Sequence, residues 1–290
     1  MKIQANGVEL EYETFGKAGD PALLLIMGLG AQLTLWPEDL CAKLAARGFH
    51  VIRYDNRDVG LSTKLDTAGV PDMPQIFAGT AKPAYTLDDM AADAAALLDA
   101  LGIAKAHIVG ASMGGMIAQL VAVNHPEKTL SLTSIMSTTG NPAVPPATPE
   151  AMQALTTRLP ADTPMEALVD NAVKTYGVIG SPIYSYDTPV ERARIRAGLE
   201  RSIYPAGFAR QMAAIVANGD RREKLKGVTA PTVVIHGSAD TLVNVEGGRD
   251  TAASIPGAEL VIIPDMGHDL PPFTLDRVVE AIAAAASRAG

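Results

Sequence analysis

The chain has 290 residues, of which 48% are hydrophobic and 19% charged, so it is long enough for one large domain with a sizeable buried core. Its net charge of −8, without a Lys/Arg cluster, argues against a nucleic-acid partner, because such proteins need a cationic face toward the phosphates. Cys41 is the only cysteine, which excludes an intrachain disulfide and a cysteine-rich zinc site.

The first residues, "MKIQANGVELEYETFG", alternate polar and apolar side chains around Asn6 and Gly7. This pattern predicts a β-hairpin and not a signal peptide, because no continuous apolar segment follows Lys2. The longest apolar runs contain glycines and fall well short of the roughly 20 residues that a membrane-spanning helix needs. We therefore expect a soluble, cytoplasmic protein without a membrane partner.

Predicted strands and helices alternate over the first half of the chain. The run "ALLLIM" is apolar throughout, which is typical of a strand buried on both faces of a parallel sheet. Thr86 is the predicted N-cap of one helix, and the polar loop "NRDVGLSTKLDTAG" precedes that helix. The alternation predicts a mostly parallel α/β sheet flanked by helices. The predicted strands are 22–27, 50–55, 106–110 and 130–137, and the predicted helices are 37–47, 86–101 and the segment after residue 112.

The alternation stops between residues 140 and 227, where proline is frequent and no buried strand is predicted. Helical patterns there predict a small helical insertion, or cap. The strand–helix alternation then returns, so we predict a core domain of residues 1–139 and 228–290 and a helical cap of residues 140–227. The predicted elements from residue 140 onward are helices 149–158, 165–176, 189–201 and 206–217, strands 231–237 and 258–264, helix 245–254 and a last helix from residue 274.

The segment "HIVGASMGGMIAQL" places the motif G-x-S-x-G between a predicted strand and a predicted helix. Gly110 and Gly114 would allow the sharp turn that holds the Ser112 hydroxyl out at the carboxyl edge of the sheet, above a helix N-terminus. A serine that only closes a tight packing turn would fit the short motif equally well. The strand before it and the helix after it favour a nucleophile.

A serine hydroxyl needs a base to take its proton, and the five histidines differ in their positions. His50, His107 and His236 lie within apolar strands, where they are expected to pack, and His125 follows the end of a helix. His268 lies in a polar loop directly after the last strand, at the edge where catalytic groups gather in open α/β sheets. We therefore predict His268 as the base.

The base needs an acid that orients its ring. Asp240 follows the strand at residues 231–237 and is expected at the same edge. Asp265 and Asp269 are nearer to His268 in sequence, but they are expected to cap the loop or the following helix. The predicted triad is therefore Ser112, Asp240 and His268.

Two backbone N–H groups are predicted to stabilise the oxyanion of a tetrahedral intermediate. One is that of Met113, at the start of the helix after the nucleophile, and the other is that of Leu29, in the loop "MGLG" with the turn glycine Gly28. The same loop is not a dinucleotide-binding fingerprint, because Leu33 stands where the last glycine of that motif belongs.

These motifs together resemble the α/β-hydrolase superfamily over nearly the whole chain, and most of all the carboxylesterases that include aclacinomycin methylesterase-like proteins. The matching segments are "LLLIMGLG", "VIRYDNRDVGLST", "HIVGASMGGMIAQLVAVNHPEK", "PTVVIHGSADTLV" and "GAELVIIPDMGHDLP". The resemblance implies a twisted α/β-hydrolase sheet with a helical cap, and ester hydrolysis through an acyl-enzyme without cofactor or metal. Met27 replaces the histidine usual before the oxyanion loop, so the bonds that brace this loop are expected to differ. Ser112 excludes the haloalkane dehalogenase and epoxide hydrolase branches, which have an aspartate there.

The leading hypothesis is a serine carboxylesterase for a small or medium apolar ester, including a methyl ester. A carbon–carbon bond hydrolase, a cofactor-free perhydrolase or haloperoxidase, and a lipase would share the triad. A non-catalytic small-molecule receptor is a different class, which the complete Ser–Asp–His set disfavours. The predicted cap is rich in Met, Leu, Ile and Tyr and poor in clustered positive charge, which favours an apolar ligand because an unpaired buried charge is costly. The sequence leaves open whether the protein forms a homo-oligomer.

Overall fold

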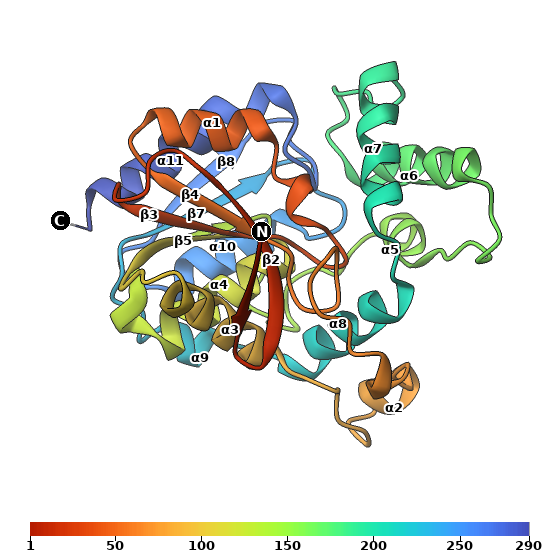
Figure 1. Ribbon diagram of the computed structural model, residues 1–290, viewed down its shortest axis with the longest axis horizontal. Coiled ribbons are helices and arrows are strands. Elements are labelled where there is room, and N and C mark those ends of the chain that lie inside the picture. The colour runs from red at the N-terminus through yellow and green to blue at the C-terminus, as the bar shows by residue number, and fades with distance from the viewer. Residues whose placement is uncertain (290) are drawn as a thin grey trace.

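A computed structural model describes residues 1–289, which form an eight-stranded sheet with helices on both faces (Figure 1). The strand order is β1-β2-β4-β3-β5-β6-β7-β8. The pairs β1–β2 and β2–β4 are antiparallel, and every later pair is parallel. The mostly parallel sheet predicted from the sequence is therefore confirmed. The strands are β1 Lys2–Ala5, β2 Val8–Phe15, β3 Ala22–Ile26, β4 His50–Tyr54, β5 Ala106–Ala111, β6 Thr129–Ile135, β7 Thr232–Gly237 and β8 Glu259–Ile263.

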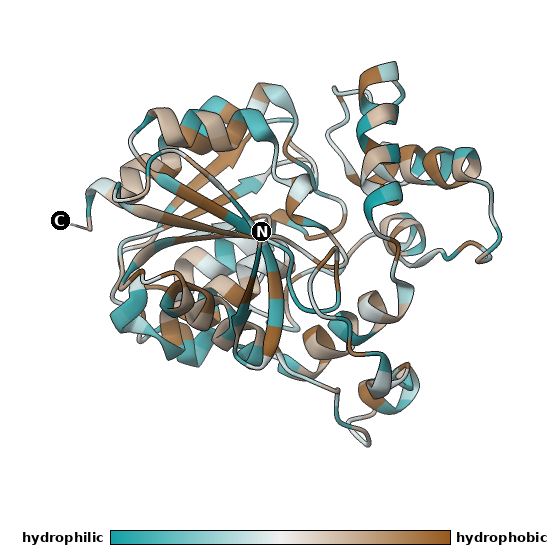
Figure 2. Ribbon diagram, in the orientation of Figure 1, coloured by the Kyte–Doolittle hydropathy of each residue, from teal (hydrophilic) through white to brown (hydrophobic). Residues whose placement is uncertain are grey.

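Two helical layers cover the sheet. Alternate residues of β3 point to opposite layers: Leu23 and Leu25 pack with α1 and α11, and Leu24 and Ile26 pack with α3 and α4. Because β3 is buried on both faces, it has no polar residue, and Figure 2 shows the hydrophobic residues concentrated in the central strands. These core helices are α1 Glu38–Ala46, α3 Leu87–Ala100, α4 Met113–Asn124, α10 Val245–Ser254 and α11 Leu275–Ser287.

The local signals that begin and join elements act as predicted. Asn6 and Gly7, both at positive φ, make the tight turn between β1 and β2. The Thr86 hydroxyl accepts a hydrogen bond from the backbone N–H of Asp89, whose carboxylate accepts from the Thr86 N–H, so α3 starts with a capping box.

Five helices lie between β6 and β7, and three of them stand beside the sheet and not on it. Figure 1 shows α5, α6 and α7 away from the strands. Helix α8 lies below α5 in this view and contacts α2. The short helix α9 packs on the core helices α4 and α10. The division of the chain into a core and a cap with boundaries at 140 and 227 remains a prediction. The bounds are α5 Pro149–Thr156, α6 Met165–Ile179, α7 Pro189–Arg201, α8 Pro205–Asn218 and α9 Arg222–Leu225.

Several elements depart from the sequence-based expectation. Helix α6 continues to Ile179, three residues beyond the predicted end at 176, whereas α5 and β6 each end two residues before the predicted ends at 158 and 137. The short helices α2, Met73–Phe77, and α9 were not predicted. The Asp72 side chain caps α2 by accepting from the Gln75 N–H. In the described part of the chain, no helix is both long and apolar enough to cross a membrane.

Candidate active site

Ser112 lies at a strained turn between β5 and α4. Its backbone has φ 58° and ψ −123°, a conformation that costs a non-glycine residue energy and is held by the surrounding structure. A Cβ on Gly110 would overlap the carbonyl of Gly114, and a Cβ on Gly114 would overlap the carbonyl of Ile26. Two glycines are thus required for α4 to approach β3 and β5 this closely. The Ser112 side chain remains partly exposed to solvent.

A chain of hydrogen bonds joins three side chains that are far apart in sequence. The Oγ atom of Ser112 lies 2.9 Å from Nε2 of His268, and Nδ1 of His268 lies 2.8 Å from Oδ2 of Asp240. Asp240 follows β7 and His268 follows β8, so both reach the carboxyl edge of the sheet at which Ser112 stands. A serine hydroxyl beside an imidazole, with the imidazole beside a carboxylate, is the arrangement that nucleophilic catalysis requires.

The surroundings of Asp240 keep its carboxyl group ionised. Burial on its own would raise the pKa of this carboxyl, but His268 and His236 lower it more, and the pKa lies well below its ordinary value. The other oxygen, Oδ1, accepts hydrogen bonds from the N–H groups of Leu242 (2.9 Å) and Val243 (2.8 Å). These two bonds hold the carboxylate in one orientation, with Oδ2 toward His268.

His236 belongs to this site, although the sequence suggested only packing for it. Its ring is fully buried, as expected, but Nε2 lies 2.8 Å from the carbonyl oxygen of Val243 and 3.4 Å from Oδ2 of Asp240. The signal available in the sequence was the position of His236 near the end of β7, four residues before Asp240.

The two other carboxyl groups near His268 in sequence have different partners. Asp265 is exposed, and its backbone N–H donates to the hydroxyl of Ser238. Asp269 is buried, and its carboxylate accepts hydrogen bonds from Ser181 and Tyr186. Neither carboxylate contacts the ring of His268 among the described residues.

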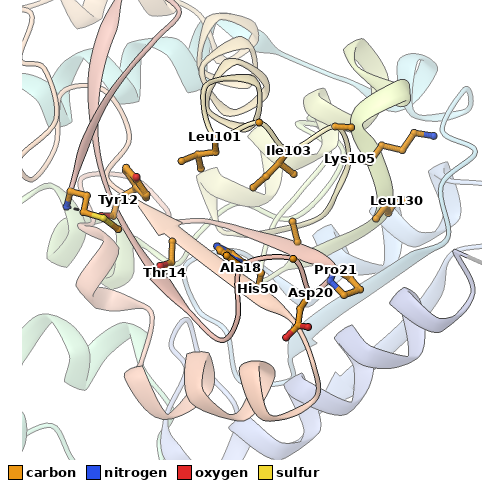
Figure 3. Close-up of a pocket in the computed structure, with 15 residues that line it drawn as sticks. Tyr12, Thr14, Ala18, Asp20, Pro21, His50, Leu101, Ile103, Lys105 and Leu130 are labelled. Atoms are coloured by element: carbon orange, nitrogen blue, oxygen red, sulfur yellow. Dashed lines mark hydrogen bonds between the residues drawn. The ribbon is translucent and has the colours of Figure 1, made fainter.

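The remaining histidines lie away from the Ser112 hydroxyl. His107 is buried, with Nδ1 2.9 Å from the hydroxyl of Ser131, as expected of a packed residue. His125 ends α4. His50 was expected to pack inside, but it is half-buried and lines a hollow of about 570 Å³ at the opposite edge of the sheet (Figure 3). This hollow lies beside the amino ends of β3, β4 and β6, away from the carboxyl edge that holds Ser112.

The two predicted oxyanion donors flank the serine. Gly28 is so close that a Cβ on it would lie 3.0 Å from Cβ and 3.4 Å from Oγ of Ser112, and Leu29 is the next residue. Met113 is the first residue of α4, where backbone N–H groups have no partner within the helix. Within residues 1–289, neither the Leu29 nor the Met113 N–H donates to another protein group. Both are thus free to donate to a bound molecule.

The loop after β3 is braced by residues that the sequence did not single out. The Asn56 side chain donates to the carbonyl of Met27 (2.9 Å), and the buried carboxylate of Asp55 accepts from the N–H of Leu33 (2.7 Å). Asp55 was predicted as the last residue of a strand and Asn56 as the first residue of a polar loop, and both are buried. Because Met27 replaces a histidine, the hydrogen bonds that brace this loop were expected to differ, and Asp55 and Asn56 supply such bonds.

A glutamine of α8 completes this support. Oε1 of Gln211 accepts from the N–H of Gly30, and its Nε2 donates to the carbonyl of Arg57, both at 2.8 Å. Gln211 is fully buried, and nothing in the sequence distinguishes it from other helix residues. The neighbouring Phe208 packs directly over Gly30.

No group of three or more His, Cys, Asp or Glu side chains in the described part of the chain is arranged to hold a metal ion. Two aromatic residues near the site have their own packing partners. Trp36 is fully buried in the core with residues of α1, and Phe208 packs on the loop after β3.

Comparison with known proteins identifies the fold family of the chain. The model of the α/β hydrolase fold family matches residues 21–273. The rhodomycin D methylesterase DnrP of Streptomyces peucetius is 31% identical, over 97% of this chain and 96% of its own. The 3-oxoadipate enol-lactonase 2 of Acinetobacter baylyi is 26% identical, over 97% of this chain and 95% of its own. The solved enol-lactonase of Burkholderia xenovorans superposes with a TM-score of 0.76 at 26% identity, over 99% of this chain and 100% of that one.

Proposed function

This chain belongs to the α/β-hydrolase fold family and is a carboxylic ester hydrolase, and we propose that it acts through Ser112 as nucleophile, His268 as general base and Asp240 as the acid that orients the base. The observation that carries the proposal is the hydrogen-bonded series from Ser112 Oγ to His268 to Asp240. It is supported by the strained backbone of Ser112, which holds the hydroxyl at the edge of the sheet.

In the first half of the proposed reaction, the ester becomes an acyl-enzyme. Oγ of Ser112 attacks the ester carbonyl carbon while Nε2 of His268 takes the hydroxyl proton. The carbonyl oxygen becomes an oxyanion that accepts hydrogen bonds from the Leu29 and Met113 N–H groups. Collapse of this intermediate breaks the bond to the alcohol, which leaves with the proton from His268.

In the second half, water replaces the alcohol. The water oxygen attacks the acyl carbon while His268 takes a proton from the water. The proton then passes to Ser112 Oγ as the carboxylic acid leaves. Throughout, the Asp240 carboxylate accepts from Nδ1 of His268, which keeps Nε2 facing the serine and stabilises the charged ring. No step needs a cofactor.

The proposed substrate is a small-to-medium apolar carboxylic ester, with a methyl ester as the first candidate. The relatives named as methylesterases support the methyl ester. The apolar preference is supported by helix α7, in which Arg192, Arg194 and Arg196 are each paired with an acidic side chain of the same region.

The test is a turnover screen with p-nitrophenyl esters of increasing acyl length and with aryl methyl esters, run beside Ser112→Ala. We expect hydrolysis by the wild type and a loss of roughly 10⁶-fold in kcat in the variant, because triad members act as a unit. If no ester is hydrolysed but a fluorophosphonate still labels Ser112, carbon–carbon cleavage and perhydrolysis become the next assays. A Ser112 that neither labels nor turns over would favour the receptor hypothesis.

A further inference from the structure

The loop that carries His268 is hydrogen-bonded to the connection between α6 and α7. The His268 N–H donates to the carbonyl of Ile179 (2.7 Å), and the Gly267 N–H donates to the hydroxyl of Ser181 (2.9 Å). The next residue, Asp269, contributes its side chain to the same connection. Three consecutive residues around the proposed base are therefore attached to one segment, residues 179–186.

Asp269 makes the most contacts in this attachment. Its Oδ2 accepts from the Ser181 N–H (2.7 Å) and from the Tyr186 hydroxyl (2.9 Å), and its Oδ1 accepts from the Ser181 hydroxyl (2.5 Å). All three residues are buried. A buried carboxylate with three donors is costly to disturb, because each donor left without an acceptor keeps its desolvation penalty.

The two segments approach so closely that side chains are excluded between them. A Cβ on Gly267 would overlap the backbone of Gly180, and a Cβ on Gly180 would lie 2.8 Å from Oδ2 of Asp269. On the far side, the ring of Tyr186 stacks on that of Tyr176 of α6 with centroids 4.3 Å apart. The attachment therefore reaches into α6, one of the helices that stand beside the sheet (Figure 1).

We propose that Asp269 is a positioning residue through which the α6–α7 connection sets the place of the His268 ring. The inference rests on the proposed function, since it assumes that His268 is the base. The ring has to meet two partners at once, Ser112 at 2.9 Å and Asp240 at 2.8 Å, and both are held by the core sheet. The N–H of His268 itself donates to Ile179, at the start of the α6–α7 connection, so a shift of that connection would change both distances. A misplacement of roughly 1 Å can cost about 10²-fold in rate.

The test compares Asp269→Asn with Asp265→Asn in the full chain. Both variants remove one carboxylate from the same loop, but Asp265 is exposed and does not touch the α6–α7 connection. Ester turnover is expressed per active site by titration with a fluorophosphonate, and the second-order rate of Ser112 phosphonylation is measured separately. We expect Asp269→Asn to lower kcat by about 10- to 100-fold with KM nearly unchanged, and to slow phosphonylation in parallel. Asp265→Asn should stay within about twofold of the wild type in both rates.

A purely structural role for Asp269 gives a different result. It would reduce the melting temperature or the number of titratable sites while each remaining site kept the wild-type rate, and that outcome overturns the inference. If Asp269→Asn does not fold, Tyr186→Phe removes only one of the three hydrogen bonds and keeps the stacked ring. An unchanged per-site rate in this variant also overturns the inference, and a loss of about 3- to 10-fold supports it.

The outcomes for the proposed function are separate. If the wild type turns over no ester, or Ser112→Ala turns over as fast as the wild type, the proposed function fails. If the wild type is active and Ser112→Ala is not, while Asp269→Asn matches the wild type, only the positioning role fails.

Discussion

Asp240→Asn tests the proposed acid by replacing one oxygen with nitrogen. Oδ1 of Asp240 accepts from the Leu242 and Val243 N–H groups, so the amide oxygen of asparagine has to take that position. The NH₂ group then stands where Oδ2 lies, 2.8 Å from Nδ1 of His268. There Nδ1 has to accept, and the ring proton moves to Nε2, the atom that faces Ser112. A protonated Nε2 cannot take the serine proton.

The expected loss follows from this change of tautomer. Holding the imidazole in the wrong tautomer costs about 10⁴-fold in kcat, which corresponds to about 5.5 kcal/mol of transition-state stabilisation. The loss in Asp240→Asn should be smaller than the roughly 10⁶-fold loss expected for Ser112→Ala, because Asp240→Asn keeps the nucleophile. Ester turnover per phosphonate-titrated site measures the loss in Asp240→Asn. Turnover per mole of total protein measures the loss in Ser112→Ala, which has no hydroxyl to titrate, and circular dichroism checks that each variant is folded.

A mild effect would refute this reasoning. If Asp240→Asn keeps more than about one tenth of the wild-type kcat, Asp240 does not set the tautomer of His268, and the acid has to be sought elsewhere. Asp265 would be the first alternative to test. Because Asp265 is exposed, we expect Asp265→Asn to have little effect on turnover.

Three further predictions concern stability and reactivity. Arg210→Ala should lower the free energy of unfolding in urea by about 3–5 kcal/mol, because the pair with Asp58 is buried and the carboxylate would lose its partner; a loss under about 1 kcal/mol would contradict this. Burial raises the pKa of Asp58, but the Arg210 guanidinium and the Leu65 N–H lower it more, and the pKa of Asp240 is lowered too. A carboxyl whose pKa is lower in the folded than in the unfolded state stabilises the fold at pH values above its unfolded-state pKa. The urea midpoint should therefore fall as the pH drops below about 4, and an unchanged midpoint between about pH 6 and 3 would count against this prediction. Burial raises the pKa of the Cys41 thiol to about 12, so a disulfide reagent at about pH 8 should label it only after denaturation, and fast labelling of the native protein would disagree.

The proximity of Ser112, Asp240 and His268 could be predicted from the sequence because each residue follows the end of a strand. Ser112 follows β5, Asp240 follows β7 and His268 follows β8, and the carboxyl ends of parallel strands meet at one edge of a sheet. The alternation of strands and helices was therefore enough to bring the three side chains together. The glycines beside Ser112 could be read for the same local reason, since they relieve contacts within a single turn.

The braces of the site could not be read in this way. Asp55 was predicted to end a strand and Asn56 to begin a polar loop, because the sequence shows their polarity but not the partners that allow them to be buried. Their partners, Leu33 and Met27, are more than twenty residues away, and the bond from Gly30 to Gln211 spans 181 positions. No periodicity links such pairs, since they arise only when separate elements pack.

Nearness to a motif in sequence is therefore a poor guide to which substitutions will disturb the site. Asp265 is three residues from His268, yet it is exposed and does not contact the ring. Gln211 lies in α8, far from every motif, yet it is fully buried and holds the N–H of Gly30, next to the proposed oxyanion donor Leu29. Positions that support the reacting groups are identified by burial and by hydrogen bonds between elements, and these exist only in the folded chain.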